Sequence, residues 1–240
     1  MEAIDEEGYC EEGVGYWQYG FGFFTLFFDV YTQLTGEKPA ILSTQKVKNL
    51  VQYMQNSQMG EQVYLPFADG GTKFFLGDGQ ILCAIKTLFG TLFTIDLSAK
   101  MKLLEGNYRA LAFRLLYGID KFSSSANEKF EKRAAKTFYY NKAQVFVYKN
   151  ANYAFAAKGG HNLELHNHND VGAFQIVKDE KRLLVDIGCG EYTRQYFSDE
   201  RYSIFVCSSF SHCVPIIGEN GQKAGKEYCG DTGYAGRGCV

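Results

Sequence analysis

The sequence lacks an excess of charge of either sign, and this shortage excludes one class of protein. Its 240 residues include 25 Lys and Arg against 27 Asp and Glu, which leaves a formal net charge of −2. A general nucleic-acid binder needs a strongly basic face, so we expect no nucleic-acid partner. The chain is 46% hydrophobic and 22% charged, which is typical of a globular protein and not of a disordered or fibrous one.

An uninterrupted apolar run and a signal peptide are also missing. The apolar stretch over residues 16–31 contains two glycines, a glutamine and an aspartate, so it predicts a core helix and not a membrane span. The first seven residues are mostly acidic and lack the basic and apolar regions of a signal peptide. We therefore expect no membrane partner and, for the chain as it stands, a cytoplasmic location. A secreted or periplasmic protein is the alternative if the natural start is missing.

Paired-cysteine motifs are absent. The 7 Cys are an odd number, and no two of them are spaced as Cys-x-x-Cys. This pattern favours reduced thiols over a disulfide framework and excludes a zinc finger. Aromatic residues, by contrast, are abundant, with 17 Tyr and 20 Phe. A tyrosine can pack its ring on a sugar while its hydroxyl stays hydrated, so a carbohydrate ligand is one interpretation, although most rings are expected in the core.

The apolar residues change their period along the chain. A helical period predicts helices over residues 16–35, 43–57, 79–91 and 107–117. Three serines at 123–125 and a charged stretch that runs to residue 136 predict a linker. An alternating pattern then predicts short strands over residues 144–148, 153–156, 173–177, 183–185 and 203–206. Helices followed by strands favour an α+β multidomain chain divided near residue 125.

The histidines are the strongest indication of chemistry. All four lie in the strand-rich half, at His161, His166, His168 and His212. His166 and His168 are two residues apart, so on a strand their imidazoles would face the same side. Together with Asp186, which follows a predicted strand, and the distant His212, they predict a metal site, because two histidines and a carboxylate are a common zinc ligand set. One of the paired histidines can instead move protons, and the alternative for each is an unrelated polar residue.

Several motifs resemble the heparinase II/III-like family. The most specific is Ala156-Ala-Lys-Gly-Gly-His-Asn-Leu-Glu-Leu-His-Asn-His-Asn-Asp-Val-Gly-Ala-Phe174. The segments over residues 183–188, 190–193, 201–202 and 208–215 follow in that family's order. Upstream, Cys10-Glu-Glu-Gly-Val-Gly-Tyr-Trp-Gln-Tyr-Gly20 is similar to a segment of the family's helical toroid. The resemblance covers most of residues 8–225.

This resemblance implies a fold and an activity. The fold would be part of an (α/α) toroid over residues 1–125, followed by an antiparallel β-sandwich over residues 126–240 that is truncated. The activity would be that of a polysaccharide lyase, which cleaves an acidic glycan by β-elimination beside a uronic acid. Because fewer helices are predicted than a toroid needs, we interpret the chain as a fragment of a longer protein. Exposed apolar helix faces in such a fragment would favour a homo-oligomer.

The resemblance also implies roles for individual residues. His166 would be the catalytic or carboxylate-neutralising imidazole, and Tyr64 would be a general acid or base. A structural zinc ion would be held by His168, Asp186 and His212. The substrate would be contacted by Glu12, Tyr16, Trp17, Tyr19 and Arg201.

Two other functions stay open. A non-catalytic module would bind an acidic glycan in the same aromatic cleft without needing His166. A cupin-like enzyme would use His166 and His168 as ligands of one iron or manganese ion. The helical first half of the chain disfavours the second alternative, because a cupin has strands there.

Overall fold

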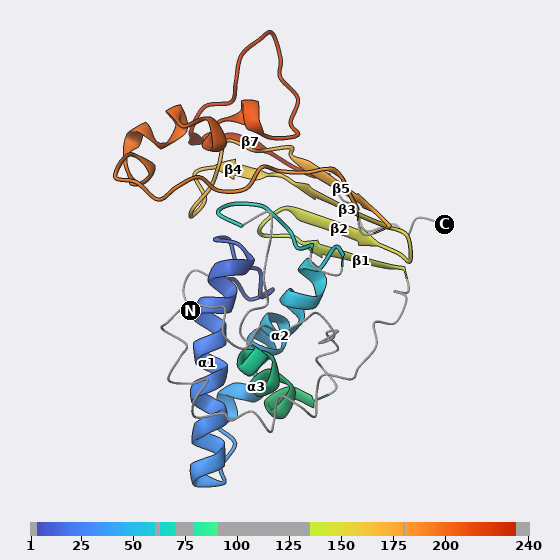
Figure 1. The fold of residues 1–240 in the computed structure, drawn as a ribbon, viewed down its shortest axis with the longest axis vertical. Coiled ribbons are helices and arrows are strands. Elements are labelled where there is room, and N and C mark those ends of the chain that lie inside the picture. The colour runs from blue at the N-terminus through green and yellow to red at the C-terminus, as the bar shows by residue number, and fades with distance from the viewer. Residues whose placement is uncertain (1–3, 61–62, 71–78, 91–134, 180, 234–240) are drawn as a thin grey trace.

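The computed structural model describes residues 4–60, 63–70, 79–90, 135–179 and 181–233. Figure 1 shows that the helices lie at one end of the molecule and the sheet at the other. The α+β class is therefore confirmed. A toroid and a sandwich remain predictions, and so does the domain boundary, which falls outside the described residues.

Among the described residues of the first part there are three α-helices, and each matches a predicted one. They are α1 (Val14–Thr35), α2 (Gln45–Ser57) and α3 (Gly79–Phe89). Helix α1 ends at Gly36, whose left-handed backbone (φ 73°) lets its N–H bond to the carbonyl of Thr32. Helix α2 begins at Thr44, whose side chain accepts a hydrogen bond from the N–H of Val47. The helix predicted over residues 107–117 lies outside the described residues.

The second part is a five-stranded antiparallel sheet with a small sheet beside it. Its strand order is β1 (Lys136–Tyr140), β2 (Val145–Lys149), β3 (Tyr153–Lys158), β5 (Phe174–Lys178) and β6 (Lys181–Leu184). The small sheet pairs β4 (Gly160–Asn162) with β7 (Gly225–Gly230). Buried and half-buried residues alternate along β2, as the predicted period of two requires. Strands β2, β3, β5 and β6 confirm four predicted strands.

One strand of this part was not predicted, and one predicted strand was wrong. Strand β1 begins at Lys136, where the predicted linker ends, and lies at an edge of the sheet; Lys136 and Thr137 are exposed and only Tyr140 is buried. The strand predicted over residues 203–206 is a series of 3₁₀ turns, η5 (Asp199–Ser203) and η6 (Phe205–Cys207). Its backbone hydrogen bonds are local, from Ile204 to Arg201 and from Cys207 to Ile204. A short apolar run does not by itself distinguish a strand from a turn.

One hydrophobic core joins the two parts. It runs from the helices, through Trp17 and Met54, to Val147 of the sheet. Tyr9 contacts both sides, with its ring centroid 5.4 Å from that of Tyr53 and 5.0 Å from that of Tyr140. The shared core holds the helical part and the sheet in a defined arrangement, which a site between them requires.

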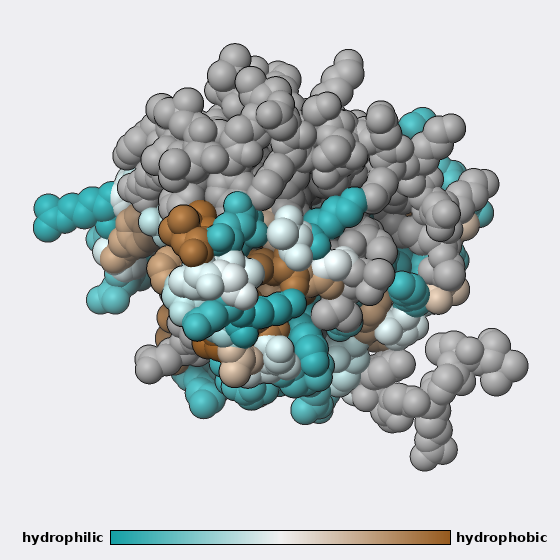
Figure 2. Space-filling model, turned by 90° about the horizontal axis from the view of Figure 1, so that it is seen from below, coloured by the Kyte–Doolittle hydropathy of each residue, from teal (hydrophilic) through white to brown (hydrophobic). Residues whose placement is uncertain are grey.

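The helical end of the molecule has apolar side chains at its surface. Figure 2 shows this end, where hydrophobic residues lie among hydrophilic ones. On α1, the exposed apolar residues include Phe27 and Leu34. Even so, none of the described helices is both long enough and apolar enough to span a bilayer.

Candidate active site

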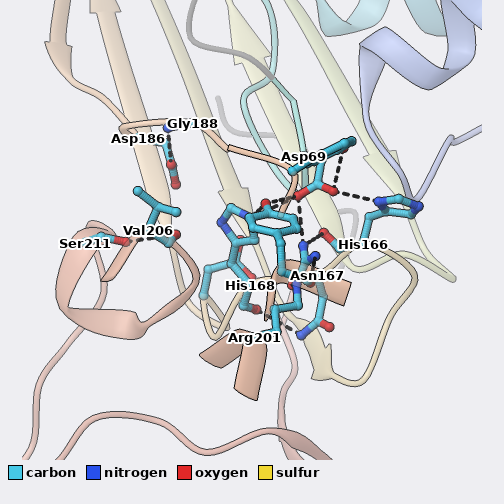
Figure 3. Close-up of polar contacts among 12 residues, drawn as sticks. Asp69, His166, Asn167, His168, Asp186, Gly188, Arg201, Val206 and Ser211 are labelled. Carbon is cyan, nitrogen blue, oxygen red and sulfur yellow. Dashed lines mark hydrogen bonds and ion pairs between the residues drawn. The ribbon is translucent and has the colours of Figure 1, made fainter. Parts of the chain in front are cut away.

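Asp69 is the centre of the candidate site, and it lies in the segment that follows α2. The chain turns there, with Ala68 in the left-handed region (φ 57°) and the N–H of Gly70 bonded to the carbonyl of Phe67. The Asp69 side chain has no exposed surface, yet it accepts five hydrogen bonds. All five donors come from the sheet part of the chain. The turn therefore places one carboxylate of the helical part among side chains that lie far away in the sequence (Figure 3).

The two oxygens of Asp69 have different partners. Oδ2 accepts from Nδ1 of His166 at 2.6 Å and from the hydroxyl of Tyr192 at 2.8 Å. Oδ1 accepts from Nε2 of His168 at 3.1 Å, from Nη2 of Arg201 at 2.8 Å, and from the hydroxyl of Tyr196. Both lone-pair regions of the carboxylate are thus occupied by donors.

The Asp69 carboxylate is ionised. Burial alone would raise its pKa, but hydrogen bonds from His168, Tyr196, His166 and Tyr192 together hold that pKa well below its usual range. Because an ionised carboxylate only accepts hydrogen bonds, the imidazole nitrogen that faces it must carry the hydrogen. His166 is therefore protonated on Nδ1 and His168 on Nε2, which leaves Nε2 of His166 and Nδ1 of His168 with lone pairs when the rings are neutral.

One edge of this cluster reaches the surface. The His166 side chain is 22% exposed and Tyr192 is 45% exposed. The His166 ring lies 4.6 Å from the ring of Tyr16, and its Nε2 lies 4.0 Å from a carboxylate oxygen of Glu12. The hydroxyls of Tyr16 and Tyr192 are 3.1 Å apart. The structure thus brings together three predicted site residues, Glu12, Tyr16 and His166.

Tyr192 is a proton donor in this arrangement. Burial, together with hydrogen bonds to Tyr16 and Asp69, raises the pKa of Tyr192 well above its usual value. The phenol therefore keeps its proton near neutral pH. The Tyr192 hydroxyl and the Nδ1–H of His166 meet at the same oxygen of Asp69, so a proton donor and a potential base lie on neighbouring side chains at the exposed edge.

Arg201, predicted to contact substrate, is instead a buried structural residue. Its Nε donates to the carbonyl of Asn167 at 3.1 Å, and its Nη1 donates to that of Tyr196 at 3.1 Å. Its Nη2 donates to Asp69 and to the carbonyl of His166, at 2.8 and 3.2 Å. Only 9% of the residue is exposed. The guanidinium therefore anchors the loop that carries His166 and His168.

Three other predicted residues lie apart from this cluster. Trp17 is fully buried, and its indole N–H donates to the carbonyl of Leu50 at 2.8 Å, so it has no face to offer to a sugar. Tyr64 is 3% exposed and packs in the hydrophobic core, which does not suit a general acid or base. Tyr19 is exposed on α1 with its ring 5.3 Å from that of Phe23.

The three predicted zinc ligands are His168, Asp186 and His212. His212 and Asp186 lie near His168, away from the exposed edge of the cluster. The rings of His168 and His212 are 5.1 Å apart, and Nδ1 of His212 pairs with Asp186. Burial lowers the pKa of His212, but the Asp186 carboxylate raises it to above its usual value. Nε2 of His212 is buried without a hydrogen-bond partner. Within the part of the chain that the structure describes, no three His, Cys, Asp or Glu side chains are grouped closely enough to hold an ion.

Sequence reasoning missed Asp69, Tyr192 and Tyr196. Asp69 stands between two predicted helices and is followed by a glycine, and an Asp-Gly pair is a turn signal that indicates no chemistry. Nothing local indicates that the side chain of Asp69 points inward. The two histidines were expected to share a site because of a strand. They occupy a loop, with His166 in the left-handed region (φ 53°), and they converge because both donate to Asp69.

Comparisons with known proteins identify a fold. No protein-family model and no curated protein matches the sequence. A crystal structure of heparinase III is similar to this structure with a TM-score of 0.59 and 13% sequence identity. A second structure, of a heparinase III gene product with methylated lysines, has 16% identity and covers 78% of this chain, with a TM-score of 0.30. The first match covers 93% of this chain but 34% of heparinase III, so the chain spans about a third of that protein. The chain therefore has a heparinase-like fold.

Proposed function

We propose that this chain belongs to a polysaccharide lyase that cleaves a uronic-acid-containing glycan by β-elimination. The fold similarity supports a polysaccharide lyase in general terms. The observation that carries the specific proposal is the half-exposed pair of His166 and Tyr192, both bonded to one oxygen of a buried, ionised Asp69. The arrangement provides a base and an acid side by side at an accessible surface.

The chemistry of elimination matches these groups. A base removes the proton at C5 of the uronate, the electron pair forms the C4–C5 double bond, and the departing O4 takes up a proton. Nε2 of His166 has the lone pair that the first step requires. Tyr192 holds a proton for O4, and the adjacent hydroxyl of Tyr16 extends the proton path. Once protonated, His166 also offsets charge on the uronate carboxylate.

Exposed rings beside the site suit a sugar. Tyr192 lies 5.0 Å from Phe197, with the ring planes at 73°, and Phe197 is 60% exposed. Two rings at a right angle present both a face and an edge to a pyranose. The rings of Tyr192 and Phe197 would therefore form an uncharged surface on which a sugar ring can pack, next to the acid and base pair.

The test is to incubate the protein with a panel of uronate polymers and to measure the ultraviolet absorbance of the unsaturated uronate that elimination forms. We expect His166→Ala to lower the rate by about 10²–10⁴-fold, the usual contribution of a general base. The matched control is His161→Ala. His161 is also half-buried, but its Nδ1 accepts a hydrogen bond from the backbone N–H of Leu163, outside the Asp69 cluster. Equal activity in the two variants would contradict the role of His166.

A non-catalytic glycan-binding module is the second candidate, supported by the same exposed rings. It predicts binding of an acidic oligosaccharide by the wild type without any unsaturated product. Binding by His166→Ala at wild-type affinity, measured by calorimetry with no turnover in either protein, would favour this candidate.

We also propose a structural zinc ion held by His168, Asp186 and His212, whose side chains would have to draw closer on binding the ion than they lie in this structure. The lone pair on Nδ1 of His168 and the unpartnered Nε2 of His212 support it, and a histidine ligand commonly donates its other N–H to a carboxylate, as His168 does to Asp69. Zinc would tie the segments around these three residues together. Elemental analysis should give about one zinc per chain in the wild type and in His166→Ala, and none in His168→Ala. Loss of metal in His166→Ala would favour the cupin-like alternative, and no metal in the wild type would refute the zinc site.

A further inference from the structure

The two oxygens of Asp69 differ in how exposed their partners are. The partners of Oδ1 are buried: His168 is 1% exposed, Tyr196 has no exposed surface and Arg201 is 9% exposed. The partners of Oδ2, His166 and Tyr192, form the exposed edge of the candidate site. One carboxylate thus faces the interior with one oxygen and the candidate site with the other.

We propose that Asp69 is a positioning residue that holds His166 in its Nδ1–H tautomer through Oδ2, while Oδ1 anchors the carboxylate to the buried trio of His168, Tyr196 and Arg201. This proposal rests on the proposed function for its kinetic consequence but not for its structural content. An imidazole that donates through Nδ1 must present Nε2 as an acceptor, which is the atom a base needs.

The hydrogen bond from Arg201 determines which oxygen of Asp69 faces the interior and which one faces His166. Arg201 can only donate hydrogen bonds, so the atom in the Oδ1 position must be an acceptor. Arg201 is held from three further carbonyls, those of Asn167, Tyr196 and His166, so its guanidinium cannot turn away without losing them. The orientation of the Asp69 side chain is therefore set from the buried side and transmitted to His166.

This asymmetry makes a specific prediction for Asp69→Asn. The side-chain oxygen of the asparagine must face Arg201, which places its NH₂ group where Oδ2 stood. The NH₂ group donates to Nδ1 of His166 and forces the hydrogen onto Nε2. His168 still meets an oxygen and keeps its Nε2–H tautomer. The substitution should therefore invert the tautomer of one histidine and leave its neighbour two residues away unchanged.

The experiment is ¹⁵N NMR of the imidazoles in the full chain at a pH where they are neutral, with His166→Gln and His168→Gln used to assign the signals. We expect Nδ1–H for His166 in the wild type and Nε2–H in Asp69→Asn, with no change of tautomer at His168. With a cleaved polymer in hand, kcat of Asp69→Asn should fall by about 10²–10⁴-fold, because the lone pair then faces the wrong way. KM should change much less than kcat.

Two tyrosine variants separate positioning from a merely structural role, and they keep the test open if Asp69→Asn does not fold. Tyr192→Phe and Tyr196→Phe each remove one hydroxyl from the same carboxylate, but from opposite oxygens. Tyr192→Phe should lower kcat, which the loss of the proposed acid also predicts, whereas Tyr196→Phe should lower the melting temperature and leave the His166 tautomer as in the wild type.

The outcomes distinguish this proposal from the proposed function. An Nδ1–H tautomer of His166 that persists in Asp69→Asn overturns the positioning role. Equal loss of melting temperature and of kcat in the two tyrosine variants also overturns it, because the oxygens would then not differ. If the wild type cleaves none of the polymers, the proposed lyase activity fails, while the tautomer measurement still decides the role of Asp69.

Discussion

Two buried ion-pair networks among the described residues differ in how they meet the surface. In the first, Asp69 meets Arg201 at 2.8 Å together with two histidines and two tyrosines. In the second, Lys158 meets Asp170 at 2.6 Å and Glu164 at 3.1 Å. Lys158 and Asp170 are at most 3% exposed. In both networks a buried carboxylate is paired with a buried cation, which offsets the cost of removing the charges from water.

The networks differ in the origin of their members. Lys158, Glu164 and Asp170 lie within 13 consecutive residues of the sheet part, so this network stabilises one local segment. Asp69, in contrast, belongs to the helical part, and its partners belong to the sheet part. Asp69 also holds His166, whose far side is open to a ligand. The comparison indicates that a buried charge can contribute to a reaction when one of its hydrogen-bond partners is exposed to a ligand, as His166 is.

The largest effect should follow from Asp69→Ala. Removing this carboxylate leaves Arg201 buried without its counter-charge, which typically costs about 3–5 kcal/mol of stability. It also frees His166 and Tyr192, so elimination should fall in the same variant by about 10²–10⁴-fold. Urea unfolding measures the first effect, and product absorbance per folded molecule measures the second. Full activity in the folded fraction of Asp69→Ala would show that the Asp69 network, like the Lys158 network, contributes to stability and not to the reaction.

Lys158→Met should have a similar effect on stability and none on chemistry. The substitution leaves Asp170 buried without a cation, so we expect a loss of about 3–5 kcal/mol in the free energy of unfolding. The rate per folded molecule should match the wild type, because Asp170 and Glu164, the carboxylates that pair with Lys158, do not belong to the exposed edge of the site. Reduced turnover in the folded variant would show that the Lys158 network also supports the site.

The contribution of Lys158 should not depend on pH between about pH 7 and about pH 9. Burial lowers the pKa of this lysine, but Asp170 and Glu164 more than offset that effect and raise it above its usual value. A raised pKa in the folded state gives a stabilisation that is complete below the unfolded pKa and is lost only as the pH rises through the folded pKa. The difference in unfolding free energy between the wild type and Lys158→Met should therefore be constant over this range. A deficit that shrinks toward pH 9 would contradict a charged lysine.

The smallest effect should come from Tyr16→Phe, which alters only the exposed edge. The variant loses the 3.1 Å contact between the hydroxyls of Tyr16 and Tyr192. One such hydrogen bond contributes about 0.5–1.5 kcal/mol, so kcat/KM should fall by about tenfold or less and stability should be unchanged. Tyr148→Phe is the matched control, because it removes a half-buried hydroxyl that accepts from Asn150 at the same distance in β2. A larger loss for Tyr148→Phe would contradict a special role for the exposed edge.

The elements of the fold were mostly predictable, and the contacts at the site were not. Helices α1, α2 and α3 follow from the helical period of their apolar residues, and β2, β3 and β5 follow from alternation. Strand β1 was not predicted, because its first two residues, Lys136 and Thr137, are exposed and only Tyr140 is buried. The prediction that His166 and His168 act together was right about their proximity, although a loop and a shared carboxylate bring them together instead of a strand.

The sequence by itself determined the local periods and the motifs that resemble the heparinase II/III-like family. The tertiary structure alone decided that Asp69 points inward, that Trp17 and Tyr64 are core residues and that Arg201 is an anchor instead of a substrate contact. The physical reason is range. Periodicity and turn chemistry act within a few residues, whereas Asp69 and His166 are separated by 97 positions and meet only because a shared hydrophobic core packs the helices against the sheet.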